Sequence, residues 1–176
     1  MSVESTEDFL RRASGPTQRH AFRHGPRITA IETLVPHDIM PGLMLLRLQT
    51  DAVPAGQDPV IGHGETYYIP TAAAAVIHDF MAPRLLGASV GAIESHWRFL
   101  YERCTAFGGT GADLRALSAV DLALWDIAGQ LADCPVYRLL GGPVRDAIPV
   151  YLCKGSSGNY SGIEDFRGCR PVFLAL

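Results

Sequence analysis

The sequence predicts an α+β domain, in which a small antiparallel sheet is followed by a set of helices. Three short segments rich in β-branched and aliphatic residues come first, and segments with helical periodicity follow them. Strands that are grouped before helices are typical of α+β folds. The chain has 176 residues, of which 48% are hydrophobic and 19% charged. The charged share is below the usual ~25%, so we expect a packed core and some apolar surface.

The predicted sheet is a three-stranded antiparallel meander. Residues 28–35, 43–50 and 60–65 are the expected strands, since they are apolar and bounded by proline and glycine. Residues 37–42 and 51–59 are the expected connections. Links this short cannot support parallel crossovers, so neighbouring strands should run antiparallel.

The first predicted helix covers residues 70–86, an alanine-rich segment that begins at Pro70. Pro83 should kink or stop it near Ala82, and Gly87 should end it. A second helix is expected over residues 90–107. Its expected buried residues are Ile93, Trp97, Leu100, Tyr101 and Cys104.

The third predicted helix runs to about Asp133, with Asp113 or Ser118 as its N-terminal cap. Its expected buried stripe consists of Leu117, Val120, Leu124, Ile127, Ala128 and Leu131. A single turn at residues 136–140 should stop at Gly141–Gly142. Residues 148–152 form one more expected strand, which has no obvious partner, and the last residues are an apolar run.

Composition argues against several classes of function. The net charge of −3 and pI of about 6.0 give no basic surface for nucleic acid. No apolar run approaches the ~20 residues of a membrane span. The four cysteines form no C-x-x-C pair, which favours reduced thiols and a cytoplasmic protein. Residues 1–26 are expected to be a disordered extension.

The most specific segment of the chain is residues 116–141, ALSAVDLALWDIAGQLADCPVYRLLG. It predicts an amphipathic helix, a turn opened by a proline, and a glycine stop. Asp121 and Asp126 lie about 140° apart around such a helix, so they cannot form a paired-carboxylate site there. Asp126 and Gln130 are four residues apart and could share a hydrogen bond.

The same segment resembles the mandelate racemase / muconate-lactonising group of the enolase superfamily. The matching positions are Ala116, Ser118, Ala119, Val120, Asp121, Ala123, Leu124, Asp126, Ile127, Gly129, Gln130, Pro135, Val136, Leu139, Leu140 and Gly141. Residues 62–65 and the link at residues 145–146 are also similar, so the likeness covers about residues 27–153. It implies an N-terminal cap domain over a modified TIM barrel.

The resemblance implies an enzyme that removes a proton next to a carboxylate, with one Mg²⁺ and a lysine or histidine base. The substrate would be a small carboxylate, and acid sugars are a candidate class. Lys154 is the only lysine, so the K-x-K pair that often ends the second barrel strand is missing. Only 31 residues follow Arg145, whereas a barrel needs at least ~200. We therefore expect no catalytic or metal-binding residues in this chain, and no turnover by it alone.

The expected domains are the extension (1–26), a cap domain (27–145) and the remnant of a barrel (146–176), with residues 148–152 as an orphan first barrel strand. In the family, two loops of the cap select substrate. They correspond here to residues 37–42 and 66–70. The resulting substrate-binding candidates are His37, Asp38, Met40, Tyr67, Tyr68 and, beyond the last strand, Lys154.

Alternatives from another class remain open. The chain could be a non-catalytic interaction or oligomerisation module, and a homo-oligomer is expected in either case. His63-Gly64-Glu65 has the H-x-E pattern of zinc deaminases, but the P-C-x-x-C partner that those sites need is missing. The glycines at 108, 109 and 111 lack the Gly-Lys-Ser/Thr of a phosphate-binding loop.

Overall fold

A computed structural model of the protein describes residues 25–38, 40–53, 58–106, 108–145, 147–151 and 171–175. The chain divides into two compact units, Met1–Val136 and Tyr137–Leu176. Most of residues 1–26, expected to be a disordered extension, lie outside the described ranges. None of the described helices is long and apolar enough to cross a membrane.

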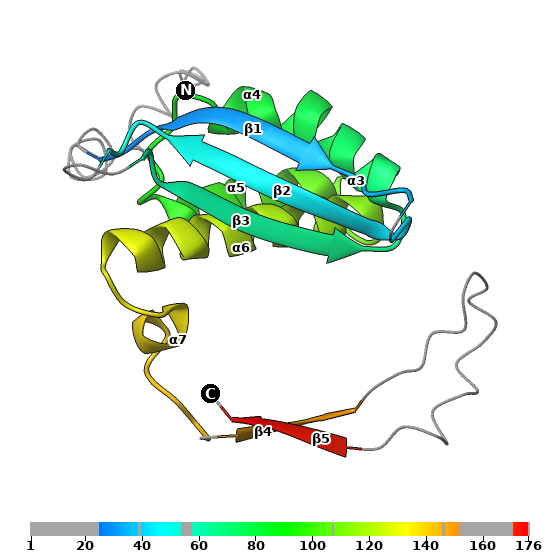
Figure 1. Ribbon diagram of the computed structural model, residues 1–176. Coiled ribbons are helices and arrows are strands. Elements are labelled where there is room, and N and C mark those ends of the chain that lie inside the picture. The colour runs from blue at the N-terminus through cyan, green and yellow to red at the C-terminus, as the bar shows by residue number, and fades with distance from the viewer. Residues whose placement is uncertain are drawn as a thin grey trace, which may run out of the picture. The chain divides into compact units, whose positions relative to one another are not determined.

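The sheet is the predicted meander. Strands β1 (Ile28–Leu34), β2 (Leu43–Thr50) and β3 (Ile61–Tyr67) pair antiparallel in the order β1-β2-β3 (Figure 1). The side chains of β2 alternate, and Met44, Leu46 and Leu48 face the core. The helices of this unit cover that face, while the other face has Arg47 paired with Glu32 at 3.3 Å.

The sequence predicted a kink or a stop near Ala82, and the stop is wrong because the helical segment continues through Pro83. It comprises α3 (Pro70–Ala75), a π-helix η1 (Val76–Met81) and α4 (Ala82–Leu85). The amide of Ala82 donates to the carbonyl of Ile77, five residues earlier. Proline cannot donate to the carbonyl four residues before it, and the wider π turn makes room for its ring. The segment ends where predicted, since Gly87 has a φ of 74°.

The two remaining helices of this unit are α5 (Ile93–Thr105) and α6 (Ala112–Leu131). Neither predicted cap residue caps α6, because Gly111 occupies the N-cap position with a φ of 79°. Asp113 lies inside the first turn instead, and the Ser118 hydroxyl donates to the carbonyl of Leu114.

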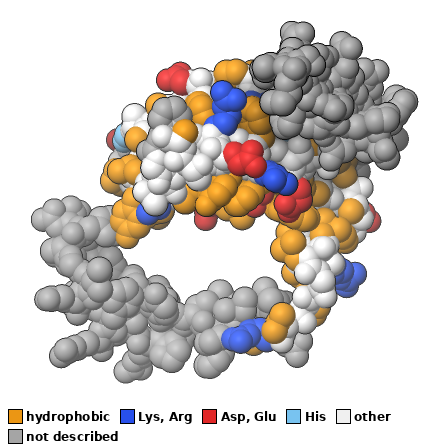
Figure 2. Space-filling view, turned by 180° about the vertical axis from the view of Figure 1, so that it is seen from behind, with side chains coloured by type: hydrophobic (Ala, Val, Ile, Leu, Met, Phe, Trp, Pro, Cys, Tyr) orange, Lys and Arg blue, Asp and Glu red, His pale blue; other side chains and the backbone are white. Residues whose placement is uncertain are grey.

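Seen from the side opposite to Figure 1, acidic and basic side chains lie close together among hydrophobic ones (Figure 2).

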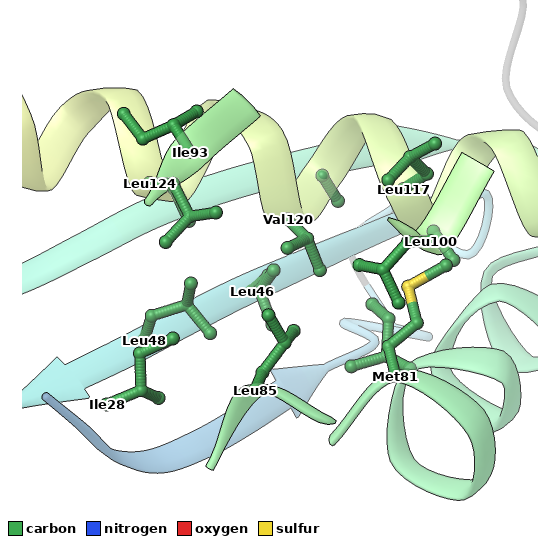
Figure 3. Packing of buried hydrophobic residues seen from close by; sticks show 14 of the residues in the cluster. Ile28, Leu46, Leu48, Met81, Leu85, Ile93, Leu100, Leu117, Val120 and Leu124 are labelled. Atoms are coloured by element: carbon green, nitrogen blue, oxygen red, sulfur yellow. The ribbon is translucent and has the colours of Figure 1, made fainter. Parts of the chain in front are cut away.

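A hydrophobic core lies between the sheet and the helices of the first unit (Figure 3). Leu117, Val120, Leu124 and Ile127 of α6 are at most 2% exposed, which confirms most of the predicted stripe. Ala128 is partly buried, but Leu131 is 44% exposed, so its predicted burial is wrong. On α5, Ile93, Leu100 and Cys104 are buried as predicted.

The aromatic residues of α5 were predicted to be buried and are not. Trp97 and Tyr101 are 38% and 37% exposed, and their rings stack with centroids 4.8 Å apart. His96 takes the core position that the pattern assigned to Trp97. Two overlapping sets of residues fit the helical spacing of α5, one with Trp97 and one with His96. Because His96 is polar, the pattern favoured the wrong set as the buried face.

Strand β3 approaches α6 unusually closely, and two glycines make this possible. A Cβ built on Gly62 would collide with the carbonyl oxygen of Ala123, and one on Gly64 with that of Ala119. Backbone atoms cannot rotate away as a side chain would, so each position requires glycine. The G-x-G pattern of this strand is therefore a packing feature.

The second unit contains most of α7 (Val136–Leu139) and a two-stranded antiparallel sheet of β4 (Ala147–Tyr151) and β5 (Pro171–Ala175). The turn ends at Gly141 and Gly142 as predicted, with φ values of 109° and 97°. The prediction of an orphan strand is wrong, because Ile148 of β4 pairs with Leu174 of β5. The apolar run near the C-terminus supplies the partner that the pattern alone did not assign.

Candidate functional site

The two loops predicted to bind substrate lie at the same end of the sheet (Figure 1). In an antiparallel meander the end of β1, the start of β2 and the end of β3 lie at the same end of the sheet. Leu43, which opens β2, pairs with Tyr67, which ends β3. A Cβ on Gly42 would lie only 3.0 Å from the ring of Tyr67, so this ring packs against the first loop.

The first loop presents His37, Asp38 and Met40 on its surface, all three exposed. Its backbone is held by local hydrogen bonds. The amide of His37 donates to Val35 at 2.9 Å, and that of Met40 to Pro36 at 2.8 Å. The loop is thus a compact turn, in which exposed side chains could contact a ligand without any change in the backbone.

The second loop carries two tyrosines in an unusual backbone conformation. Tyr68 and Ile69 have φ values of 65° and 39°, in the left-handed region that non-glycine residues rarely adopt. The rings of Tyr67 and Tyr68 meet edge to face with centroids 4.9 Å apart. Tyr67 is half-buried, whereas Tyr68 is 54% exposed. An exposed aromatic ring on a fixed turn is suited to contact a ligand.

Arg115 of α6, which sequence reasoning missed, contacts this second loop. Its Nη1 donates to the backbone carbonyl of Tyr67, and its guanidinium lies 5.0 Å from the centroid of the Tyr68 ring. The recognised motif begins one residue later, at Ala116, so it gave no indication of this contact. The sixth candidate, Lys154, lies outside the described residues.

The described residues of the two loops offer polar and aromatic groups but no assembled metal site. Nowhere in the described part of the chain do three histidine, cysteine, aspartate or glutamate residues come together as a metal site would require. The residues that the structure describes therefore do not fit a Mg²⁺ site, which needs several carboxylate or carbonyl oxygens around one ion. The site can contribute hydrogen bonds, an aromatic surface and exclusion of water.

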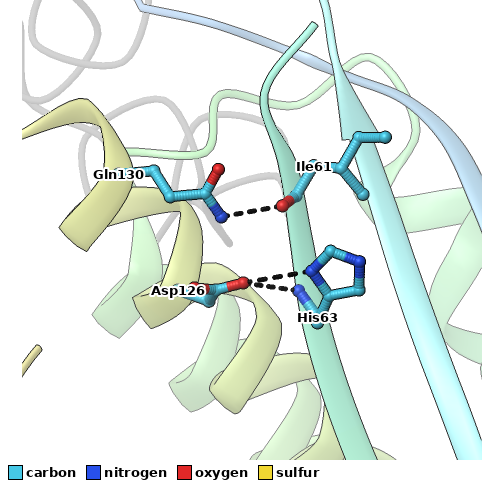
Figure 4. Close-up of polar contacts among 4 residues, drawn as sticks. All are labelled: Ile61, His63, Asp126 and Gln130. Carbon is cyan, nitrogen blue, oxygen red and sulfur yellow. Dashed lines mark hydrogen bonds and ion pairs between the residues drawn. The ribbon is translucent and has the colours of Figure 1, made fainter. Parts of the chain in front are cut away.

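Asp126 and Gln130 connect α6 to β3 (Figure 4). The carboxylate of Asp126 accepts from the backbone amide of His63 at 2.8 Å and lies 3.5 Å from its ring Nδ1. The Gln130 side chain donates to the carbonyl of Ile61 at 2.8 Å. The predicted option of a bond between Asp126 and Gln130 is thus replaced by two bonds to the neighbouring strand, which is a structural role.

Three titratable groups away from the loops are perturbed by burial. Desolvation lowers the pKa of His96, and Arg84 lowers it further, against a hydrogen bond to Ser89 that raises it. Burial, together with Asp113, raises the pKa of the Cys104 thiol. Burial and the nearby Glu94 raise the pKa of Asp121. These groups lie on α5 and α6.

Solved structures of other proteins contain a domain similar to this one. The solved structure of an enolase protein from the Sargasso Sea environmental genome sequence is 40% identical, with a TM-score of 0.62. The match covers 71% of this chain and 32% of that one. A mandelate racemase/muconate lactonizing protein from Paracoccus denitrificans, complexed with magnesium, is 29% identical with a TM-score of 0.61, over 71% of this chain and 33% of that one.

Curated relatives include enzymes named as dehydratases. The D-galactonate dehydratase of Verminephrobacter eiseniae is 35% identical over 139 residues, 78% of this chain and 34% of that protein. The D-mannonate dehydratase of Caulobacter vibrioides is 44% identical over 89 residues, 51% of this chain and 21% of that protein. The chain thus spans between about a fifth and a third of the length of these relatives.

The family described as "Mandelate racemase / muconate lactonizing enzyme, N-terminal domain" matches residues 21–141. The match includes the whole meander and all the helices of the first unit. The three-stranded sheet and the helices that follow it are thus features of a domain known from longer proteins. The chain belongs to this N-terminal domain family of the enolase superfamily.

Proposed function

We propose that this chain is the substrate-capping domain of an enzyme that removes the proton next to the carboxylate of an acid sugar. The observation that carries the proposal is the meeting of the two loops at one end of the sheet. Four of the candidate residues there, His37, Asp38, Met40 and Tyr68, are exposed. Together they offer hydrogen-bonding groups and an aromatic surface, which suit a polar ligand with a carbon skeleton.

The names of the relatives support the substrate class. Mannonate and galactonate, which appear in these names, are sugar acids that carry a carboxylate beside a row of hydroxyl groups. Elimination of water from such a molecule begins with loss of the proton next to the carboxylate. Magnesium would stabilise the resulting enediolate. The described residues of this chain would bind and cover the substrate, and the base and the metal ligands would come from a barrel.

A graft into a relative tests the capping role. Residues 25–141 would replace the corresponding segment of the Caulobacter vibrioides D-mannonate dehydratase. We expect the chimera to keep Mg²⁺-dependent dehydration of at least one sugar acid. Tyr68→Ala in the graft should raise KM more than it lowers kcat, because Tyr68 would contact substrate without taking part in the chemistry.

The matched control in the graft is Arg98→Ala, since Arg98 lies on α5 with its side chain 80% exposed and pairs with Glu102 of the same helix. This variant should leave both constants unchanged. The capping role would be refuted by a folded, active chimera that keeps the substrate preference of the parent dehydratase and whose preference does not change when His37 or Tyr68 is substituted.

The purified chain alone should show no Mg²⁺-dependent turnover. The reason is that its described residues assemble no metal site, and its sequence contains no K-x-K pair. The measurement is an assay over a panel of sugar acids with added Mg²⁺, with a full-length dehydratase as the positive control. Turnover that co-purifies with the chain and vanishes with EDTA would contradict this expectation.

We also propose that the protein is a homo-oligomer in the cytoplasm. The outer face of the sheet supports self-association, since Leu34 is 61% exposed and the neighbouring Leu43 and Leu45 are only half-buried. An apolar strip on the uncovered face of a sheet is a common contact between subunits. Light scattering across a concentration series would measure the state, and a Leu34→Glu variant should shift it toward monomer.

A further inference from the structure

The turn after β3 needs an external support. Tyr68 and Ile69 are consecutive residues with positive φ, and Ile69 is β-branched, for which this region is a genuine outlier. Ile69 also precedes Pro70, and the residue before a proline is normally driven to an extended backbone. Such a conformation persists only when surrounding contacts impose it.

Arg115 makes two contacts with this turn, on either side of the point where the backbone becomes left-handed. Its Nη1 donates to the carbonyl of Tyr67, and its guanidinium stacks on the Tyr68 ring at 5.0 Å. The residue is half-buried in the fourth position of α6, a helix fixed by the core. An arginine beside a proposed substrate loop would be expected to bind a carboxylate, yet this guanidinium is engaged with the protein itself.

The support extends to the other loop through Tyr67. The ring of Tyr67 lies against Gly42, at the end of the first loop, and its backbone pairs with Leu43. A residue that fixes Tyr67 therefore also restricts the loop that presents His37 and Asp38. One side chain of α6 would in this way set the positions of both loops relative to the core.

We propose that Arg115 is a positioning residue that holds the Tyr67–Tyr68 turn, and with it the exposed Tyr68 ring, in a binding-ready conformation. This inference rests on the proposed function for its purpose, but its physical content concerns this chain alone. Arg115 acts through Tyr68 and does not touch the substrate. Loss of Arg115 should therefore release the loop while leaving the core of the domain folded.

The first test is a spectroscopic signature in the unmodified 176-residue chain. Protons of the Arg115 side chain lie over an aromatic ring, so their NMR signals should shift upfield. Tyr68→Leu should remove that shift and leave the signals of Arg98, on a different helix, unchanged. Arg115 signals at ordinary positions in the wild-type chain would overturn the proposal without any need for an arginine variant.

The second test is amide exchange at the start of α3. The amide of Ala73 donates to the carbonyl of Ile69 at 3.1 Å, so its protection reports whether the turn keeps its shape. Arg115→Ala should speed the exchange of Ala73 by about tenfold or more, since a hydrogen bond from a charged donor is lost. Arg115→Lys should restore part of the protection, because a lysine keeps a donor and a cation but not the planar fork.

Arg98→Ala is the matched control for this test, because it removes a surface arginine from a helix without touching the loop. It should leave the protection of Ala73 at the wild-type level. Equal exchange in Arg115→Ala and wild type would refute the positioning role. Both readouts use the chain by itself, so a folded, active chimera with unchanged substrate preference, combined with these two positive results, would reject the capping function while leaving the role of Arg115 intact.

Discussion

At the scale of single residues, the pattern of α6 predicted the core well because its apolar stripe is long and unambiguous. Leu124 and Ile127 are buried as expected, whereas Trp125 is only partly buried. The stripe on α5 was harder to predict, since Trp97 and His96 offered competing faces. Arg115 could not be predicted at all, because its partners are 47 and 48 residues away and one is a backbone carbonyl. Sequence periodicity reports burial and carries little information on such polar contacts.

Leu124→Ala should lower the free energy of unfolding by about 2–5 kcal/mol, the range for removing a buried leucine side chain and leaving a cavity. Leu124 is 1% exposed in the centre of the core. Leu122→Ala is the control on the same helix, since Leu122 is 51% exposed and should change stability by less than about 0.5 kcal/mol. Chemical denaturation of both variants measures the difference. Similar values for the two would show that this face of α6 is not the packed one.

His96 should make the domain less stable in mild acid. Its Nε2 lies 2.9 Å from the carbonyl of Ser89 and therefore carries the proton, while Nδ1 is buried without a partner among the described residues. Burial first, and Arg84 second, lower its pKa in the folded state. As pH falls below about 6.5, the pKa of histidine in the unfolded chain, His96 becomes protonated in the unfolded chain but stays neutral in the folded one. Stability should then fall with decreasing pH, by at most about 1.4 kcal/mol per pH unit from this group.

The variant that checks this is His96→Gln, which keeps a donor for Ser89 but does not titrate. Urea denaturation at pH 7.5 and pH 5.5 should show a smaller loss of stability in the variant than in the wild type. An identical loss in both proteins would mean that the acid sensitivity arises elsewhere.

At the scale of elements, the order and direction of the strands and helices could be predicted, but the details of their ends could not. Pro83 indicated a kink or a stop, and the actual outcome is a π turn that keeps the helix continuous. Asp113 resembled a cap, but the start of α6 is set by Gly111, whose positive φ allows the chain to enter the helix. Both differences arise because several local solutions satisfy the same residues, and tertiary packing chooses among them.

Gly64→Ala should lower the free energy of unfolding by about 1–3 kcal/mol or more, as expected for overpacking. The added methyl group would collide with the backbone carbonyl of Ala119, so β3 and α6 would have to move apart. Gly91→Ala is the matched control, because a Cβ there meets only the Ser89 hydroxyl at 3.8 Å. Thermal melts of the two variants make the comparison. A Gly64 variant as stable as the Gly91 variant would show that the close approach is dispensable.

At the scale of the whole molecule, the residues in the core cluster all lie between Ile28 and Ile127. All the residues of this cluster belong to the first unit. The sequence pattern predicted a cap domain over residues 27–145 and a barrel remnant over residues 146–176, and this division stays a prediction. It could not predict that β4 and β5 pair, since nineteen residues lie between Tyr151 and Pro171. Pairing across such a distance depends on long-range contacts that a local pattern does not encode.

Deleting residues 147–176 should leave the first unit as stable as it is in the full chain. The deletion removes β4 and β5, and none of the residues in the core cluster. A two-stranded sheet is at best marginally stable by itself, and each of its strands keeps one edge that could pair with another chain. We therefore expect the full chain to associate more readily with rising concentration than the shortened one. Thermal melts would compare stability, and light scattering over a concentration series would compare association.

A lower melting temperature after the deletion would show that the second unit stabilises the first. A monodisperse full chain with slow amide exchange at Ile148 and Val150 would show that the β4–β5 pair is a stable structure whose edges do not drive association.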